Sequence, residues 1–216
     1  MIHNWDLETI PEEGKKLRLI MPEFKANKNV KDPEKIKAQI QEKKHAFFRD
    51  AALSPYTGRI ALIGYYDGKN FIIQRSDETE EADMLKTFWA SFNDAKTNKF
   101  AGWRIKYFDL KFLWGRSIVL GVEIPVTAKI GRQWNERFVD LHDIYTAFEY
   151  KAFVSLDNAA KSLGLYERVE KDVTGADFYI WWNNSEEKKQ KCIQYLKDDL
   201  TVTYNICEML KKAYRI

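Results

Sequence analysis

Residues 59–75 read RIALIGYYDGKNFIIQR, and this stretch decides the fold class that the sequence predicts. Two apolar runs, Arg59–Tyr66 and Asn70–Arg75, flank the turn residues Asp67-Gly68-Lys69. Asp-Gly between apolar runs is a strong β-hairpin signal, because glycine tolerates the positive φ that a tight turn requires. We therefore predict two antiparallel strands joined at this turn.

The segments on either side of the hairpin alternate between strand and helix patterns. Met1–Asp6, Phe100–Tyr107 and the short Phe138–Leu141 are predicted strands. Glu80–Asn98 and Asp109–Leu120 are predicted helices, the second ending at Gly121. A hairpin beside βα units implies a mixed sheet flanked by helices. We predict an α/β fold with one domain over residues 1–216.

The C-terminal third is predicted to be mostly helical. We expect helices near Asp143–Tyr150 and Ser155–Leu163, then an irregular stretch, Leu165–Asn184, and a long final helix, Glu186–Tyr214. The two cysteines lie 15 residues apart on that last helix, which separates them by about 22 Å, too far for a disulfide. Reduced thiols without a Cys/His zinc pattern are typical of a cytosolic protein.

A charged segment, residues 12–54, separates the first strand from the hairpin. Glu12–Asp50 contain 11 Lys/Arg against 7 Asp/Glu, so much of the basic excess of a chain with net charge +3 lies here. Asp32-Pro33-Glu34 is typical of a helix start, and we predict a helix from Pro33 to about Leu53. The basic excess fits either a solvated helical surface or a face toward nucleic acid.

The composition indicates a folded globule, with 45% hydrophobic and 14% aromatic residues. No apolar run approaches membrane-spanning length, and Asp6 interrupts the region where a signal peptide needs its apolar core. No glycine-rich phosphate loop supports binding of a nucleoside triphosphate. We expect a soluble, cytoplasmic protein that makes no membrane contact.

Acidic side chains recur at positions where separate elements begin or end. Asp6 and Glu8 are two residues apart, so on a strand their side chains emerge from the same face. Asp109 stands where a predicted strand gives way to a helix, and Asp199 follows Tyr195 by four residues on one helical face. Taken singly, Asp6 and Glu8 also fit an exposed acid pair, and Asp109 fits a helix N-cap. Tyr195 alone also fits a core aromatic residue.

Taken together, the four carboxylates and the tyrosine predict a metal centre. Mg²⁺ or Mn²⁺ prefers hard oxygen ligands, and four carboxylates suffice to hold two such ions against a phosphate. Two ions about 4 Å apart activate a water molecule and stabilise a leaving 3′-oxygen. A tyrosine hydroxyl beside that water orients it, because its usual pKa near 10 keeps it neutral.

Three segments resemble the exonuclease motifs of the DEDD superfamily. They are Asp6-Leu-Glu8-Thr9, Gly102-Trp-Arg-Ile-Lys-Tyr-Phe-Asp109-Leu-Lys-Phe-Leu and Tyr195-x-x-x-Asp199. The tyrosine before the last aspartate is similar to the DEDDy branch, and the chain is most similar to stand-alone relatives of the proofreading exonuclease of family-B DNA polymerases. Val154–Gly164 resembles the helix that precedes the third motif in that group. The resemblance covers residues 1–12 and 54–212.

This resemblance implies a ribonuclease-H-like fold and a 3′-5′ exonuclease with two Mg²⁺ or Mn²⁺ ions. Asp6, Glu8, Asp109 and Asp199 would be the metal ligands, and Tyr195 would orient the water. Two features depart from the family pattern. Arg104 stands where an asparagine is common, and the connection from Pro11 to about Pro55 is unusually long.

Several residues near the motifs are predicted to contact nucleic acid. Thr9 belongs to the first motif, Arg104 is a candidate phosphate contact together with Lys106, and Phe108 and Phe112 are candidate wedges against the terminal base. Trp181 and Trp182 fit either base stacking or core packing.

The leading hypothesis is an exonuclease acting on the 3′ end of single-stranded DNA. The alternatives are an exoribonuclease with the same site and a non-catalytic nucleic-acid-binding module of a replication or repair complex, with replication or repair proteins as partners.

Overall fold

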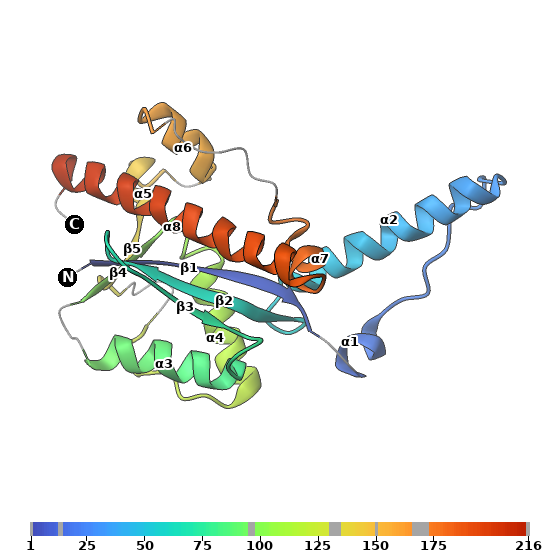
Figure 1. Cartoon of the computed structure of the whole chain (residues 1–216), viewed down its shortest axis with the longest axis horizontal. Helices are drawn as coiled ribbons and strands as arrows, with labels where there is room; N and C mark the ends of the chain where they lie inside the picture. The colour runs from blue at the N-terminus through green and yellow to red at the C-terminus, as the bar shows by residue number, and fades with distance from the viewer. Residues whose placement is uncertain are drawn as a thin grey trace.

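The computed structural model describes residues 2–12, 15–94, 98–129, 135–149, 151–165 and 173–214. Within these residues, five strands form one sheet in the order β3-β2-β1-β4-β5 (Figure 1). The strands are β1 (Ile2–Pro11), β2 (Gly58–Tyr66), β3 (Phe71–Arg75), β4 (Lys99–Gly102) and β5 (Phe138–Asp140). β2 pairs antiparallel with β1 and β3, whereas β4 pairs parallel with β1 and β5. The predicted hairpin and mixed sheet are confirmed.

Helices cover both faces of the sheet (Figure 1). One layer contains α3 (Glu81–Asp94) and α4 (Asp109–Leu120). The other contains α5 (Leu141–Tyr145), α6 (Leu156–Ser162), α7 (Phe178–Trp182) and α8 (Glu186–Ala213). None of the helices in the described part of the chain has the length and apolar character needed to cross a membrane.

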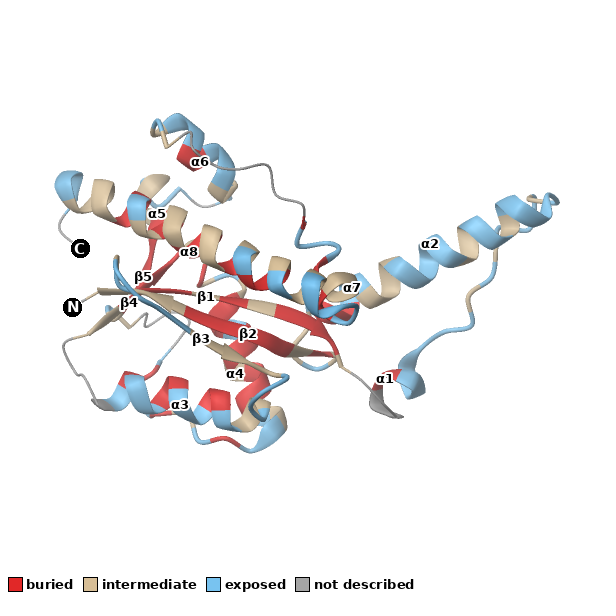
Figure 2. Ribbon diagram, in the orientation of Figure 1, coloured by how far each residue is buried: buried red, intermediate tan, exposed pale blue. Residues whose placement is uncertain are grey.

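Much of the central sheet is buried (Figure 2), and the two faces of β1 bury different side chains. Trp5 and Leu7 pack with the aromatic residues of α3 and α4, whereas Ile10 packs with α7 and α8. Successive strand residues point to opposite faces, so the side chains of Asp6 and Glu8 lie on the α8 side. The strand pattern therefore directs both carboxylates toward the final helix.

The long helix α8 approaches the sheet closely at Gly64. A methyl group built on Gly64 would lie 2.7 Å from Leu200 Cδ1 and 2.8 Å from Leu196 Cδ2. The two leucines thus occupy the space that any side chain at this position would fill. Gly64 is also the β2 partner of Asp6, so this contact places α8 directly over the acidic part of β1.

The segment between β1 and β2 projects from the body as an arm (Figure 1). It contains α1 (Lys15–Ile20) and α2 (Pro33–Ala52), and Asp32 caps α2 by accepting a hydrogen bond from Glu34 N at 2.9 Å. The coil before α2 packs back along it, since Asn27 N donates to Gln39 Oε1 at 3.0 Å and the Phe24 and Phe47 rings lie 5.7 Å apart. The predicted α2 is confirmed, whereas α1 was not predicted.

A buried arginine joins the two ends of this arm. Arg116 of α4 is 2% exposed and pairs with Glu12 at 2.9 Å, just after β1. Its guanidinium also donates to Pro55 O at 3.1 Å, just before β2, and pairs with Glu81 of α3 at 2.6 Å. Glu81 in turn accepts from Ile60 N at 2.8 Å. This network fixes where the chain leaves the sheet and where it returns.

Several predicted boundaries are wrong. β1 does not end at Asp6 but runs to Pro11, because β2 pairs with it along this whole length. The strand predicted over 100–107 ends at Gly102, where the chain turns. α3 is described to Asp94, and residues 95–97 of the helix predicted over 80–98 lie outside the described residues. The short α5 covers 141–145 rather than 143–150. α7 forms inside the stretch predicted to be irregular.

Arg116→Met should lower the free energy of unfolding by about 3–5 kcal/mol, because it leaves two partly buried carboxylates without their cation. Lys86→Met is the matched control, since it breaks an exposed pair with Asp83 and should cost less than about 1 kcal/mol. Urea denaturation measures both values. Equal effects of the two substitutions would show that Arg116 does not hold the arm to the body.

Candidate active site

Four carboxyl groups from three elements converge on the α8 side of the sheet. One ligand atom from each of Asp6, Glu8 and Asp199 lies within 4.8 Å of the other two. Asp109 lies beside them, because it lines the same cavity and its charge raises the pKa of Asp6. Asp109 is the first residue of α4, and Phe108 holds the N-cap position without a side-chain cap. The alternative of an ordinary Asp109 cap is therefore wrong.

The carboxylates line a cavity of about 470 Å³. The same cavity is lined by Tyr195, which precedes Asp199 by one helical turn on α8, and by Thr9, Arg104 and Phe108. Other parts of its wall come from the end of the arm, at Arg49, Ala52 and Leu53, and from Gly175 and Ala176 before α7 and Tyr179 within it. This volume lies within the ~300–1,000 Å³ typical of ligand sites.

Burial and mutual repulsion raise the pKa values of these acids. Desolvation and the neighbouring charges of Asp109, Glu8 and Asp199 raise the pKa of Asp6 well above its usual value. The pKa of Glu8 is raised well above its usual value by desolvation and then by Asp199 and Asp109. Desolvation is also the main reason that the pKa of Asp109 rises to about 7. The protein thus concentrates negative charge at a cost that a bound cation would offset.

The donor set fits divalent metal ions. Carboxylate oxygens are the ligands that Mg²⁺ and Mn²⁺ prefer, and three of them already lie within the span of one coordination sphere or of two adjacent ones. Burial, and then repulsion between neighbouring carboxylates, raises the pKa values of Asp6 and Glu8 well above their usual range. The residues present therefore fit a divalent-metal centre.

A tight turn places Asp109. After Gly102 the backbone of Arg104 adopts a positive φ of 59°, and the carboxylate of Asp140 accepts hydrogen bonds from Arg104 N at 3.1 Å and Lys106 N at 3.0 Å. Asp140 is 2% exposed and also caps α5. This contact explains why the predicted strand stops early and where α4 begins.

A second acidic group, made of Asp140, His142 and Asp143, is engaged by contacts within the protein. Asp143 pairs with Lys106 Nζ at 2.8 Å and accepts from Tyr107 OH at 3.1 Å. Nε2 of His142 accepts from Val154 N at 3.2 Å, which leaves the proton on Nδ1. These contacts support the turn and make the group a poor match to a metal site.

Some of the predicted substrate contacts line the acidic cavity, whereas others are buried or engaged elsewhere in the protein. Thr9, Arg104 and Phe108 line the acidic cavity. Arg104 stacks over Phe153 at 4.5 Å, and its Nε has no hydrogen-bond partner among the described residues. Phe112 was wrongly placed at the substrate: it is 1% exposed and packs in the core between the sheet and α4.

Two other candidate contacts, Lys106 and Trp182, are engaged within the protein. Lys106 lies in the turn rather than on a strand face, and its ammonium group is engaged by Asp143. Trp182 is 3% exposed and stacks on Phe178 at 6.1 Å. These side chains serve the packing of the site rather than its surface.

Two residues at the site escaped sequence reasoning. Arg49 reaches the cavity from α2, and no local pattern signals this because the contact depends on how the arm joins the body. Asp140 holds the turn from 36 residues away. One indication of a role for Asp140 was present in the sequence. This residue ends a short apolar strand, where α/β folds often place functional side chains.

Asp109→Asn should stabilise the metal-free protein more at pH 8 than at pH 5.5. The folded chain keeps a proton on Asp109 up to a pKa of about 7, whereas the unfolded chain loses it near 3.9, so stability falls as pH rises between these values. Removing the group removes this penalty, and the Tm in EDTA should rise by a few degrees at pH 8. Asp83→Asn, an exposed acid on α3, should not reproduce the gain. A gain that is equal at both pH values would contradict the burial argument.

Comparison with known proteins agrees with this geometry. The family model described as predicted 3′-5′ exonucleases related to the exonuclease domain of PolB matches residues 57–211. The structure of the family B DNA polymerase from the hyperthermophilic archaeon Pyrobaculum calidifontis has a similar fold, with a TM-score of 0.63 at 16% sequence identity. That match covers 97% of this chain and 24% of the polymerase, so the chain spans about a quarter of its length. No curated protein sequence is significantly similar.

These findings confirm the predicted fold class and the predicted resemblance. The matched region begins at the hairpin and includes Asp109, Tyr195 and Asp199, while Asp6 and Glu8 precede it. The chain belongs to the family of predicted 3′-5′ exonucleases related to the exonuclease domain of PolB.

Proposed function

We propose that the protein hydrolyses phosphodiester bonds at the 3′ end of single-stranded DNA, using two divalent ions, Mg²⁺ or Mn²⁺. The observation that carries this proposal is the convergence of Asp6, Glu8 and Asp199 within 4.8 Å, with Asp109 lining the same cavity. Membership of a family of predicted 3′-5′ exonucleases supports the reaction class and its polarity.

Asp6, Glu8, Asp109 and Asp199 would hold the ions. Bound in this way, the ions would supply charge for the phosphate and for the leaving 3′-oxygen. The four side chains come from β1, α4 and α8, which are packed elements rather than loops, so their carboxyl groups are fixed before substrate arrives. Preorganisation of this kind lowers the cost of assembling charge around the reacting phosphate.

Tyr195 would orient the attacking water. It lines the same cavity as the acids and lies one helical turn before Asp199, so its hydroxyl faces the region where the phosphate would bind. A neutral hydroxyl both donates and accepts hydrogen bonds, and this suffices to align a water with the P–O3′ bond. The water oxygen forms the new bond to phosphorus, the P–O3′ bond breaks, and the shortened strand keeps a 3′-hydroxyl.

The cavity wall supports a single-stranded substrate. Thr9 and Phe108 would contact the terminal nucleotide, while Arg104 and Arg49 provide positive charge near phosphates that flank the acids. Arg104 would replace the amide contact that an asparagine makes at this position in similar proteins. A cavity of about 470 Å³ accommodates a splayed terminal nucleotide more readily than a duplex end.

Asp199→Ala should lower the rate of strand shortening by about 10³-fold or more, because it removes a charge that acts on the reacting phosphate. Tyr195→Phe should cost about 10–100-fold, since water orientation weakens while the acidic group remains. Asp198→Ala is the control on the same helix: this side chain accepts a bond from Gln194 and should leave the rate within about twofold.

The assay follows a DNA oligonucleotide labelled at its 5′ end, with an RNA of the same sequence in parallel, in magnesium, manganese or EDTA. The proposal predicts a ladder that shortens from the 3′ end of DNA and disappears in EDTA. Faster shortening of the RNA would replace the DNA assignment by the ribonuclease alternative. Full activity of Asp199→Ala would show that the centre lies elsewhere.

A further inference from the structure

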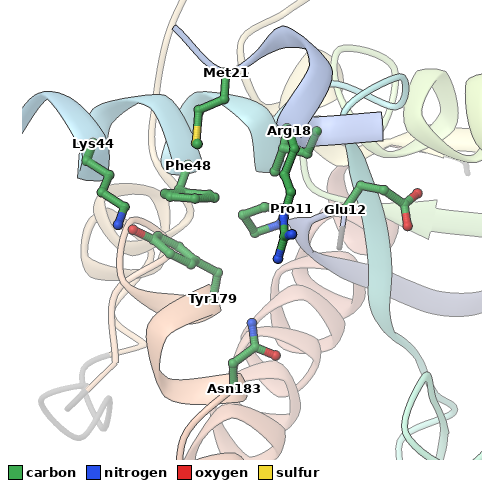
Figure 3. A pocket seen from close by; sticks show the side chains of 9 residues that line it. Pro11, Glu12, Arg18, Met21, Lys44, Phe48, Tyr179 and Asn183 are labelled. Atoms are coloured by element: carbon green, nitrogen blue, oxygen red, sulfur yellow. The ribbon is translucent and has the colours of Figure 1, made fainter. Parts of the chain in front are cut away.

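A second cavity, of about 530 Å³, lies where α1, α2 and α7 meet (Figure 3). Tyr179 lines both this cavity and the acidic one, so the two cavities are neighbours that share one aromatic side chain. α2 also contributes to both: Lys44 and Phe48 line the second cavity, whereas Arg49 lines the first. The base of the arm therefore connects the two spaces.

The partition between the cavities is held in place by contacts from the arm. The rings of Phe48 and Tyr179 stack at 6.3 Å, and His45 Nδ1 lies 3.1 Å from the Tyr179 hydroxyl. Two residues of α2, one stacked on the ring and one at its hydroxyl, thus hold the Tyr179 side chain of α7. Such a wall is preorganised, and a ligand would not have to order it on binding.

The second cavity presents positive charge beside aromatic surface. Arg18 and Lys44 extend toward it from α1 and α2 (Figure 3), and among the described residues neither has an ion-pair partner. Among the described residues that line it, the one acid, Glu12, is already paired with the buried Arg116 at 2.9 Å. The exposed amide of Asn183 completes the lining with a donor and an acceptor.

This combination matches the parts of a nucleotide. Two cations suit a phosphate, the faces of Phe48 or Tyr179 suit a base, and an amide suits a base edge. The volume of about 530 Å³ is also within the range of sites for small ligands. An apolar ligand would bury Arg18 and Lys44 without a counter-charge, and this desolvation cost argues against a hydrophobic peptide.

The charge distribution favours a strand over a free nucleotide. Residues 15–53 carry 11 Lys/Arg against 5 Asp/Glu, whereas the rest of the chain carries 24 against 27. The positive charge of the protein is thus concentrated on the arm beside the cavity, and a polyanion gains from that field more than a mononucleotide does.

We propose that the second cavity is a nucleotide-binding subsite for the substrate strand, upstream of the 3′-terminal nucleotide. The strand passes Tyr179 at Arg49, and Arg18 and Lys44 bind a phosphate while the base rests against the aromatic wall. This assignment rests on the proposed function, because it takes the acidic cavity as the place of the 3′ end.

The test measures the affinity of single-stranded DNA from two to ten nucleotides in EDTA, by fluorescence anisotropy over a range of salt. The affinity of wild type should rise in a step once the strand is long enough to reach the second cavity. Arg18→Ala and Lys44→Ala should each remove most of that step and lower the slope of log affinity against log salt by about 0.7. Lys86→Ala, on α3 beyond the opposite face of the sheet, is the control and should keep both the step and the slope.

The inference is overturned if both substitutions leave the step and the slope unchanged. It is also overturned if deoxyadenosine monophosphate competes as well as the decanucleotide, since the cavity would then bind a free nucleotide. Hydrolysis by wild type with magnesium or manganese is measured separately. A step that depends on Arg18 without any hydrolysis would support the subsite and contradict the proposed function, so the two failures are distinguishable.

Discussion

The close approach of α8 to the sheet at Gly64 is the constraint on which the rest of the site depends. Leu196 and Leu200 fill the space above this glycine, and Asp199 lies between them in the sequence. Gly64 pairs with Asp6 across the β1–β2 ladder, so the same contact that seals the core brings Asp199 to Asp6 and Glu8. A side chain at position 64 would have to displace the terminal methyl groups of Leu196 and Leu200 at the contact that flanks Asp199.

The gathering of these carboxyl groups in one cavity destabilises the folded protein when no metal ion is bound. Several acids share one cavity, and burial together with repulsion raises the pKa values of Asp6 and Glu8. Elsewhere the fold neutralises buried charge: Arg116 is matched by two glutamates, and Asp143 by Lys106. The acidic cavity is therefore a local exception to the way this chain handles charge, and such exceptions mark sites where an external cation or substrate completes the balance.

Local patterns predicted the fold better than they predicted the boundaries of the site. The Asp67-Gly68 turn gave the hairpin, and the bounds of α4 were correct because Asp109 and Gly121 mark its ends. The strand predicted through Arg104 failed because Asp140, 36 residues away, bends that segment. The spacings of Asp6 with Glu8 and of Tyr195 with Asp199 predicted two shared faces, but only tertiary packing joins these faces. The positions of Phe112 and Arg49 were also beyond local patterns. Distant elements bury Phe112 in the core and bring Arg49 to the acidic cavity.

The central claim is that the acids of β1, α4 and α8 form a divalent-metal centre that acts on a 3′-terminal nucleotide. Anomalous diffraction from crystals grown with Mn²⁺ and a nucleoside 5′-monophosphate tests it most directly. The account predicts two manganese peaks within reach of Asp6, Glu8, Asp109 and Asp199, with the phosphate bound between them and the Tyr195 hydroxyl. Manganese at Asp140, His142 and Asp143, with the first group vacant, would contradict it.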